Sequence, residues 1–345
     1  MIFLRILLYP FAVLYNLITS IRNTLYDQGR KASVQFDLPV IGVGNLTVGG
    51  TGKTPMIEYL IRLLCNEYEV ATLSRGYGRQ TKGFHIADPS DNAKTLGDEP
   101  FQFYVKYGDR VTVAVGEERA LAIPSILQKV RKTEIILLDD AYQHRSVQPS
   151  LNILLTEYYR PFYNDLLLPA GRLRESKENA GRADLVLVTK CPEELSDEDM
   201  IEIEKGIRKY ADKPVFFTHI RYGSPVPYSR QDKIMKENVI LISGISNPRP
   251  FVTYARQNFK VIKEITFKDH HDFTVSDLEK FVRYQQQYPN VSLLTTEKDK
   301  AKLGSAELSA YTSQLSLFYI PIEFFFNRNG RDFNEIVLNS IKRAG

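Results

Sequence analysis

The stretch of sequence that decides the fold reads Leu38-Pro39-Val40-Ile41-Gly42-Val43-Gly44-Asn45-Leu46-Thr47-Val48-Gly49-Gly50-Thr51-Gly52-Lys53-Thr54-Pro55. Its apolar beginning, 38–43, is typical of a buried strand. The glycine-rich part that follows lets several backbone N–H groups point at one anion, and the next helix adds its positive dipole end. Lys53 would then contact the β- and γ-phosphates of a nucleotide, while the Thr54 hydroxyl would bind Mg²⁺. The stretch predicts a nucleotide-binding loop formed by Thr47, Val48, Gly49, Gly50, Thr51, Gly52, Lys53 and Thr54.

This loop departs from the usual pattern G-x-x-x-x-G-K-[ST] in one position, because Thr47 stands where the first glycine is expected. Gly49 and Gly50 can restore the turn. The alternative is a glycine-rich connection between strand and helix that binds no ligand. We favour the nucleotide site, because Gly-Lys-Thr directly after a strand supplies both charged roles together.

Short β-rich runs alternate with helical stretches after this loop. The first five, several of them apolar on both faces, are 69–73, 111–115, 134–138, 151–155 and 185–188. Such strands belong in a parallel sheet covered by helices, which predicts a doubly wound α/β domain with its ligand at the switch point. Four later runs predict a second, smaller α/β unit: 239–242, 261–267, 291–295 and 317–322.

The first eighteen residues are apolar around nearly the whole helical circumference. We expect this helix either to cross a membrane narrowly or to lie shallowly in one leaflet. Arg22, Arg30 and Lys31 follow it, which places the body of the protein on the cytoplasmic side. A cleaved signal peptide and a buried terminal helix are the alternatives. The expected organisation is a membrane-anchoring helix at 1–25, a P-loop domain at 30–222, a linker at 223–237 and a smaller α/β domain at 238–345.

The composition is that of an ordinary globular protein. The chain has 345 residues, 43% of them hydrophobic, and a net charge of +4 that is not gathered into long basic blocks. Nucleic-acid binding therefore has little support, although an acidic substrate fits. Cys65 and Cys191 are the only cysteines and have no metal or redox spacing, which agrees with a reducing compartment.

A second informative site is the apolar run 135–138, which leads into Asp139 and Asp140. Carboxylates at the end of a buried strand beside a phosphate loop are where Mg²⁺ is usually held. An Asp-Asp turn alone is weak evidence, since such turns are common at strand ends. Together with the Gly-Lys-Thr loop, it predicts a metal-dependent phosphoryl site.

The run Asp139-Asp140-Ala141-Tyr142-Gln143-His144-Arg145 resembles the Asp-Asp-Gly-Phe-Gln-His-Arg run of the tetraacyldisaccharide 4′-kinases, membrane-bound kinases of lipid A biosynthesis. Six further segments of that family's pattern are present, so the resemblance covers nearly the whole chain: Ser74-Arg75-Gly76-Tyr77-Gly78-Arg79, Gly97-Asp98-Glu99-Pro100, Leu167-Leu168-Pro169-Ala170-Gly171-Arg172-Leu173-Arg174-Glu175, Ser243-Gly244-Ile245-Ser246-Asn247-Pro248, Asp269-His270 and Thr296-Glu297-Lys298-Asp299. A small hydroxyl residue at the position of Thr47 is also typical of this family.

The resemblance implies a lipid kinase with ATP and Mg²⁺ as cofactors. Such an enzyme transfers the γ-phosphate of ATP to the 4′-hydroxyl of an acylated glucosamine disaccharide 1-phosphate, which yields lipid IVA at the inner face of the cytoplasmic membrane. An amino-terminal membrane segment agrees with a substrate lodged in the bilayer. The acyl chains would stay in lipid while the sugar head group enters the cleft.

The same resemblance assigns proton removal to Asp98, working with His270. Helix capping is the alternative for Asp98, because Gly-Asp-Glu-Pro is good capping chemistry. For His270 the alternative is a surface histidine, and His271 next to it is a second candidate for the same role.

The resemblance also places Glu175 with Asp139 and Asp140 around Mg²⁺, and Arg174 against phosphate. Arg75 and Arg79 lie in a glycine-broken segment and suit a flexible loop that binds an anion such as the 1-phosphate. Arg119 is a further candidate for substrate or γ-phosphate binding. His144 either lines the nucleotide site or is a core histidine.

Two other classes of protein compete with a kinase. A nucleotide-operated switch or membrane-recruited ATPase gains some support from Thr189-Lys190 after an apolar run, but Pro192 occupies the place of the aspartate that guanine-binding proteins need. A passive lipid-binding protein does not require the phosphate and metal apparatus. For Glu297-Lys298-Asp299 we expect a hinge or a charged surface, without a chemical role.

Overall fold

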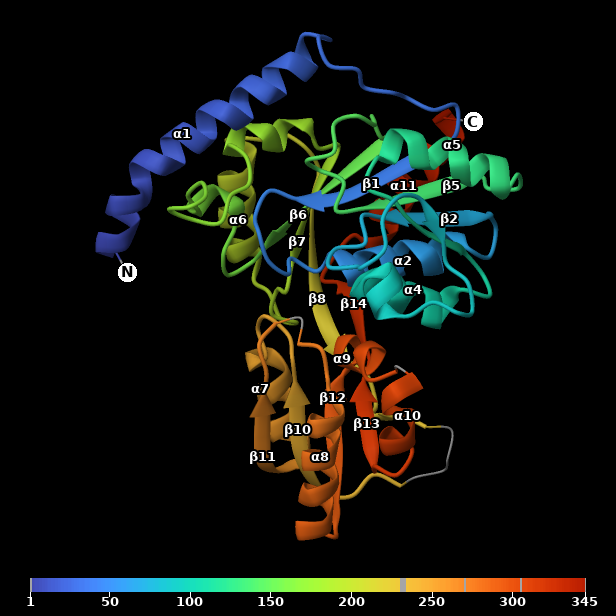
Figure 1. The fold of residues 1–345 in the computed structure, drawn as a ribbon. Coiled ribbons are helices and arrows are strands. Elements are labelled where there is room, and N and C mark those ends of the chain that lie inside the picture. Colours follow the sequence, from blue (N-terminus) through green and yellow to red (C-terminus); the bar gives the residue numbers. More distant parts are fainter. Residues whose placement is uncertain (1, 230–233, 270, 305, 345) are drawn as a thin grey trace.

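A computed structural model describes residues 2–229, 234–269, 271–304 and 306–344. Its larger domain is built on a nine-stranded sheet that is parallel except at its two edges (Figure 1). From edge to edge the strands are β14 (Ile322–Phe326), β8 (Val215–Tyr222), β7 (Leu185–Thr189), β6 (Leu151–Glu157), β1 (Val40–Asn45), β5 (Ile135–Asp139), β2 (Val70–Ser74), β4 (Thr112–Val115) and β3 (His85–Ile86). The predicted α/β fold with a large parallel sheet is confirmed.

Alternate residues of each central strand point to opposite sides of the sheet, and in this sheet both sets are apolar. Helices therefore cover both faces. Ile41 and Val43 pack with α2 (Lys53–Leu64), α4 (Asp98–Tyr107) and α11 (Gly330–Ala344). Val40, one residue out of phase, packs with α5 (Arg119–Lys129). The remaining elements of the domain are α3 (Ala93–Leu96), α6 (Asp197–Arg208) and the short 3₁₀ helices η1 (Phe162–Asn164) and η2 (Lys177–Arg182).

The smaller domain has a five-stranded sheet of its own. Its strand order is β11 (Lys260–Thr266), β10 (Asn238–Ser243), β12 (Val291–Thr296), β13 (Leu317–Ile320) and β9 (Val226–Pro227). The helices around it are α7 (Arg249–Asn258), α8 (Val275–Gln287), α9 (Glu297–Lys302) and α10 (Ala306–Thr312). Figure 1 shows this domain, in orange, beneath the larger one.

The predicted domain boundaries need a correction at the C-terminal end. The run 317–322 was expected to form one strand, but the chain leaves the smaller domain after β13, and β14 pairs antiparallel with β8 in the large sheet. Phe324 of β14 and Phe333 of α11 then pack in the larger domain's core. Two segments therefore connect the two domains, one after β8 and one between β13 and β14. Where they pass each other, Gly223 N–H donates to Pro321 O at 2.9 Å.

Helix α1 (Ile2–Asp27) lies along the outside of the larger domain (Figure 1). Most of its large apolar side chains between Ile6 and Ile21 are more than half exposed, so the alternative of a buried terminal helix is wrong. Among the described residues, no helix combines the length and the apolar character that crossing a membrane requires.

Candidate active site

The predicted phosphate loop joins β1 to α2 and needs its glycines. Gly49 and Gly52 have positive φ angles of 105° and 89°, a region that side chains with a Cβ rarely adopt. A Cβ added to Gly52 would also lie 2.8 Å from Phe324 Cζ. The first part of the loop is tied down by Arg172, whose carbonyl accepts from Val48 N–H at 2.7 Å.

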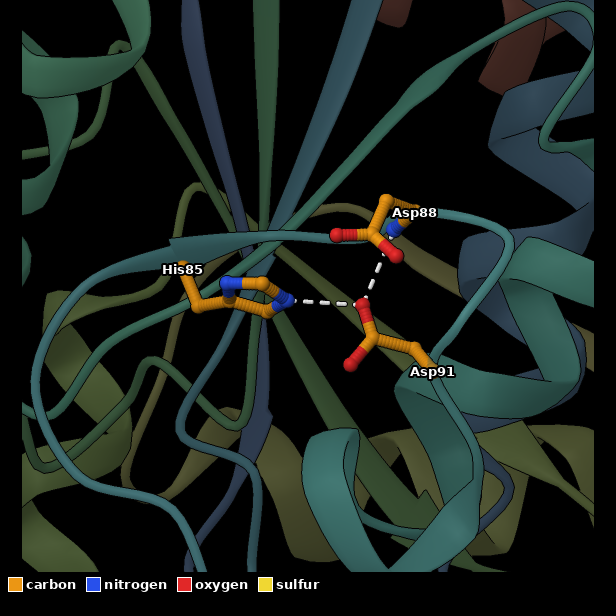
Figure 2. Close-up of side chains that lie close together, drawn as sticks. All are labelled: His85, Asp88 and Asp91. Carbon is orange, nitrogen blue, oxygen red and sulfur yellow. Dashed lines mark hydrogen bonds and ion pairs between the residues drawn. The ribbon is translucent and has the colours of Figure 1, made fainter.

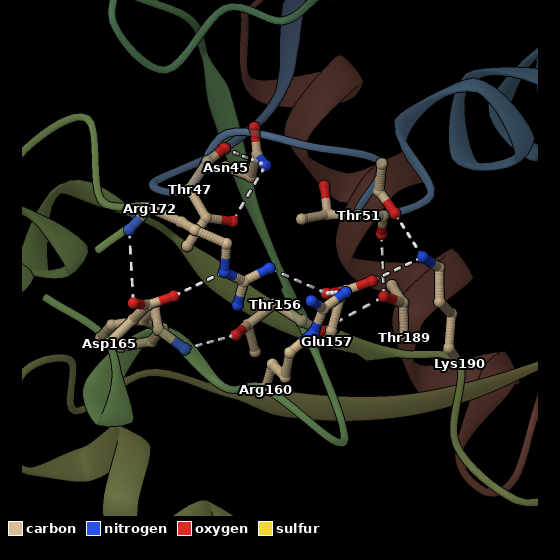
Figure 3. A network of polar contacts seen from close by, with 12 residues as sticks. Asn45, Thr47, Thr51, Thr156, Glu157, Arg160, Asp165, Arg172, Thr189 and Lys190 are labelled. Atoms are coloured by element: carbon tan, nitrogen blue, oxygen red, sulfur yellow. Dashed lines mark hydrogen bonds and ion pairs between the residues drawn. The ribbon is translucent and has the colours of Figure 1, made fainter. Parts of the chain in front are cut away.

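The second part of the loop is held from β7. The Thr189 hydroxyl donates to Thr51 O at 2.8 Å, and the Lys190 ammonium donates to Gly50 O. Figure 3 shows Lys190 also reaching Glu157, whose carboxylate contacts Arg172 from the other side. Burial acts to raise the pKa of Glu157, but the charges around it, Lys190 first, outweigh burial and lower the pKa. The buried carboxylate of Glu157 thus connects Arg172 and Lys190, the two residues that hold the first and second parts of the loop. The sequence had suggested only a resemblance to guanine-binding proteins here.

Lys53, at the start of α2, faces the carboxylates after β5. Its Nζ atom lies 3.3 Å from Asp140 Oδ1 and 3.1 Å from Asn45 Oδ1. Arg174 contacts both oxygens of Asp140, at 3.0 and 2.8 Å. Although burial acts to raise the pKa of Asp140, Lys53 and the hydrogen bonds from Arg174 lower it. The carboxylate is therefore ionised at neutral pH, and the three predicted residues are brought together.

Asp139 differs sharply from Asp140 although it is the next residue in the chain. It is buried, and burial raises its pKa to about 6 against the opposing charge of Lys53. One oxygen, Oδ2, lies 3.4 Å from the Ser74 hydroxyl, while Oδ1 has no hydrogen-bond partner among the described residues. A buried carboxylate oxygen left without a partner beside a lysine fits a site that takes up a cation.

Glu175 is not gathered with the two aspartates. Among the described residues, the only group of three possible ligand atoms within 4.8 Å of one another lies elsewhere. Glu175 instead accepts from Asn23 of α1 at 2.9 Å and from Arg182 at 2.7 Å. Its Oε1 is buried without a partner in the described part of the chain. The carboxylate therefore anchors α1 in this structure.

The predicted anion-binding arginines have different surroundings. Arg75 is exposed, but Arg79 is paired with Glu117 at 2.6 Å and its side chain is 2% exposed. Arg119 is fully buried, and its Nη1 donates to Gly116 O at 2.7 Å. Burial lowers its pKa to about 10. Arg75 is thus accessible from solvent, whereas Arg79 and Arg119 contact the protein's own groups.

His144 is partly buried, and the charges of Arg119 and Asp140 act on its ring. Burial, followed by the charge of Arg119, lowers its pKa to about 4, so the ring is neutral at pH 7. The neighbouring Gln143 donates to Asn45 O at 2.9 Å, and its Oε1 is buried without a partner among the described residues. The sequence prediction missed Asn45 and Gln143, although both stand inside the motifs that it used.

Asp98 begins α4 and lies at the contact with the smaller domain. The capping alternative is wrong, because Gly97 is the cap residue and Asp98 lies inside the first turn. Lys302 of α9 approaches Asp98 Oδ2 at 3.5 Å. His270 lies outside the described residues. His271 is engaged within the smaller domain, where its Nε2 pairs with Asp277 at 3.0 Å.

His85, Asp88 and Asp91 form the group of possible metal ligands noted above (Figure 2). His85 Nε2 lies 2.7 Å from Asp91 Oδ2, which also accepts from Asp88 N–H at 2.9 Å. The other oxygen of Asp91 accepts from the Thr95 hydroxyl at 2.7 Å. These contacts fasten the loop that leads through α3 to Asp98.

A glycine loop between a central parallel strand and a helix, with its lysine facing carboxylates after the adjacent strand, defines a P-loop nucleotide-binding protein. The sequence profile of the family described as tetraacyldisaccharide-1-P 4′-kinase matches residues 4–342. The chain belongs to this tetraacyldisaccharide 4′-kinase family.

Individual relatives agree with this placement. The chain is 46% identical to the tetraacyldisaccharide 4′-kinase of Flavobacterium johnsoniae, with 98% of each chain covered. It is 38% identical to that of Bacteroides thetaiotaomicron over 97% of this chain and 93% of the relative. The crystal structure of LpxK from Aquifex aeolicus in complex with ATP is similar with a TM-score of 0.77 at 29% identity, covering 98% of this chain and 99% of the other.

Proposed function

We propose that the protein transfers the γ-phosphate of ATP to the 4′-hydroxyl of a tetraacylated glucosamine disaccharide 1-phosphate. The observation that carries the proposal is the contact of Lys53 with Asp140 over 3.3 Å beneath the glycine loop, in a chain of this family. Loop N–H groups and Lys53 would neutralise the phosphates, which is the main requirement of phosphoryl transfer.

Mg²⁺ is the metal that the donor set fits. Asp139, Asp140 and the Thr54 hydroxyl are the candidate ligands, and the unpartnered Oδ1 of Asp139 supports this choice. When bound, the ion would offset charge on the β- and γ-phosphates. Glu175 is left out of the proposed set, because it does not lie with the two aspartates in this structure.

Asp98 is the proposed base for the sugar hydroxyl. It begins α4 at the contact with the smaller domain and lies outside the phosphate loop. His270, its predicted partner, lies outside the described residues. Arg174, which holds Asp140 here, and the exposed Arg75 are the proposed contacts for substrate phosphate.

We also propose that α1 rests on the cytoplasmic surface of the inner membrane. Five apolar side chains at helical spacing, each more than half exposed, form a stripe along it: Leu7, Phe11, Leu14, Ile18 and Ile21. On another face, Tyr15 donates to Arg174 O at 3.0 Å and Arg22 to Gln143 O at 2.6 Å. The helix thus joins the active-site segments to an apolar surface suited to lipid.

Acceptor dependence tests the proposal. Purified protein with Mg²⁺ and γ-labelled ATP should label the lipid when tetraacyldisaccharide 1-phosphate is supplied in mixed micelles, and Lys53→Ala and Asp98→Ala should each reduce labelling at least a hundredfold. The variant Lys205→Ala, at an exposed position of α6, is the control. ATP hydrolysis that ignores the lipid would instead indicate a nucleotide switch, and full labelling by Asp98→Ala would remove that residue from catalysis.

A further inference from the structure

Helix α9 carries the segment Glu297-Lys298-Asp299, for which the sequence offered no chemical role, and it packs against α4 of the larger domain. Lys298 pairs with Glu99 of α4 at 3.0 Å. Lys106 of α4 pairs with Glu297 at 2.8 Å and with Glu58 of α2 at 2.6 Å. Charged contacts therefore fix α9 of the smaller domain to the helix that begins with Asp98.

Lys302 is the member of α9 that reaches Asp98 itself. Its side chain is 3% exposed, and its Nζ lies 3.5 Å from Asp98 Oδ2 and 3.6 Å from Asp299 Oδ1. The same ammonium donates to Gly244 O at 3.3 Å. Of these contacts, only Asp98 belongs to the larger domain.

The smaller domain fixes this ammonium in place. Asp299 is completely buried, and its Oδ2 accepts from Gly244 N–H at 2.9 Å and from the Thr296 hydroxyl at 2.8 Å. A buried carboxylate needs a cation, and Lys302 supplies it. Because Asp299 and Gly244 hold one side of the ammonium, the remaining side is presented to Asp98.

We propose that Lys302 is a positioning residue for phosphoryl transfer, which holds the Asp98 carboxylate in place and favours its ionised form across the domain contact. This inference rests on the proposed function, in which Asp98 accepts the sugar proton. An ionised acceptor is required for that step, and an opposite charge within about 4 Å favours it. Lys298 is a second cation nearby, and its charge interacts with Glu99, Asp269 and Asp98. Both of these lysines belong to the smaller domain, so they act on Asp98 when that domain is docked.

Lys302→Met tests the proposal, with Lys300→Met as the matched control. Lys300 lies on the same helix, but its ammonium sits 4.9 Å from the ring of Tyr319 rather than beside Asp98. For Lys302→Met we expect kcat to fall roughly ten- to a hundredfold through misplacement of the base. The KM for ATP should stay within about twofold, because the phosphate loop is untouched. The acidic limb of the kcat–pH profile should move to higher pH, and Lys302→Arg should restore much of the activity.

Loss of Lys302 leaves Asp299 without its cation, so a double variant separates folding from catalysis. Lys302→Met/Asp299→Asn removes both charges, and it should unfold at a higher temperature than Lys302→Met while kcat stays low. If the double variant turns over like the unmodified protein, or if Lys302→Met and Lys300→Met behave alike, the inference is overturned while the kinase activity stands. If Asp98→Asn keeps full lipid phosphorylation, Asp98 is not the base. In that case the positioning role of Lys302 is also excluded.

Discussion

Lys190 offers a direct test of how the phosphate loop is kept ready for ATP. Its ammonium joins Gly50 O in the loop to Glu157, and its own backbone is left-handed with a φ angle of 58°. In Lys190→Met, an apolar side chain of similar length remains. The loop loses one of its two anchors on the β7 side, while Thr189 still holds Thr51.

The size of the effect follows from the contacts that are lost. A hydrogen bond from a charged donor is worth about 1.5–3 kcal/mol. The Lys190 side chain is 27% exposed, so solvent screening reduces this to about 1 kcal/mol. Since 1.4 kcal/mol is tenfold in affinity, we expect ATP to bind about fivefold more weakly.

Arg160→Met is the matched control, because Arg160 pairs with the other oxygen of Glu157, Oε2, at 3.3 Å, while Lys190 pairs with Oε1. Isothermal titration with ATP and Mg²⁺ should give a weaker Kd for Lys190→Met and an unchanged Kd for Arg160→Met. Equal Kd values for the two variants would show that the contact of Lys190 with Gly50 does not prepare the loop for ATP.

Three further predictions concern stability and the membrane. Burial acts to raise the pKa of Glu157, but the neighbouring cations outweigh burial and lower the pKa. The contribution of Glu157 to stability is therefore present above the pKa of the unfolded state, and it is lost as the pH falls through the pKa of the folded state. Urea denaturation should therefore show Glu157→Gln destabilised by about 1–2 kcal/mol at pH 7, with a difference that shrinks below about pH 4. Phe333→Ala, at a fully buried position, should cost about 3–5 kcal/mol in the unfolding of the larger domain, and a loss under about 1 kcal/mol would show that α11 does not belong to that core. Phe11→Glu/Ile18→Glu should reduce sedimentation with anionic vesicles at least tenfold without changing ATP affinity, whereas unchanged sedimentation would mean that α1 does not contact lipid.

Local sequence patterns predicted the central strands well, because β1, β5, β6 and β7 are buried, mostly apolar runs that end at polar residues: Asn45, Asp139, Glu157 and Thr189. The edge of the large sheet was not predictable in the same way. The sequence predicted one strand over 317–322, and only the pairing of β14 with β8 shows that Leu317–Ile320 and Ile322–Phe326 belong to different sheets. That pairing joins residues about a hundred positions apart, which no local pattern reveals.

In the candidate active site, too, local motifs predicted some contacts, whereas others depend on tertiary packing. The Gly-Lys-Thr loop and Asp140 come from neighbouring strand ends, so motif reasoning brought them together correctly. Glu175 and Arg79 have the residue types of ligand-binding groups, but tertiary contacts with Asn23 and Glu117 engage them instead. The contact between Lys302 and Asp98 depends on how two domains pack, and its signal in the sequence was only an unexplained charged segment.

The position of the new phosphate on the lipid product is the most direct test of phosphoryl transfer to the 4′-hydroxyl. After incubation with ATP, Mg²⁺ and tetraacyldisaccharide 1-phosphate, phosphorus–proton correlation NMR of the purified lipid should show a second phosphate monoester coupled to the proton on C4′. A lipid that retains only its original 1-phosphate, while ATP is converted to ADP and free phosphate, would show that the protein is not a 4′-kinase of this lipid.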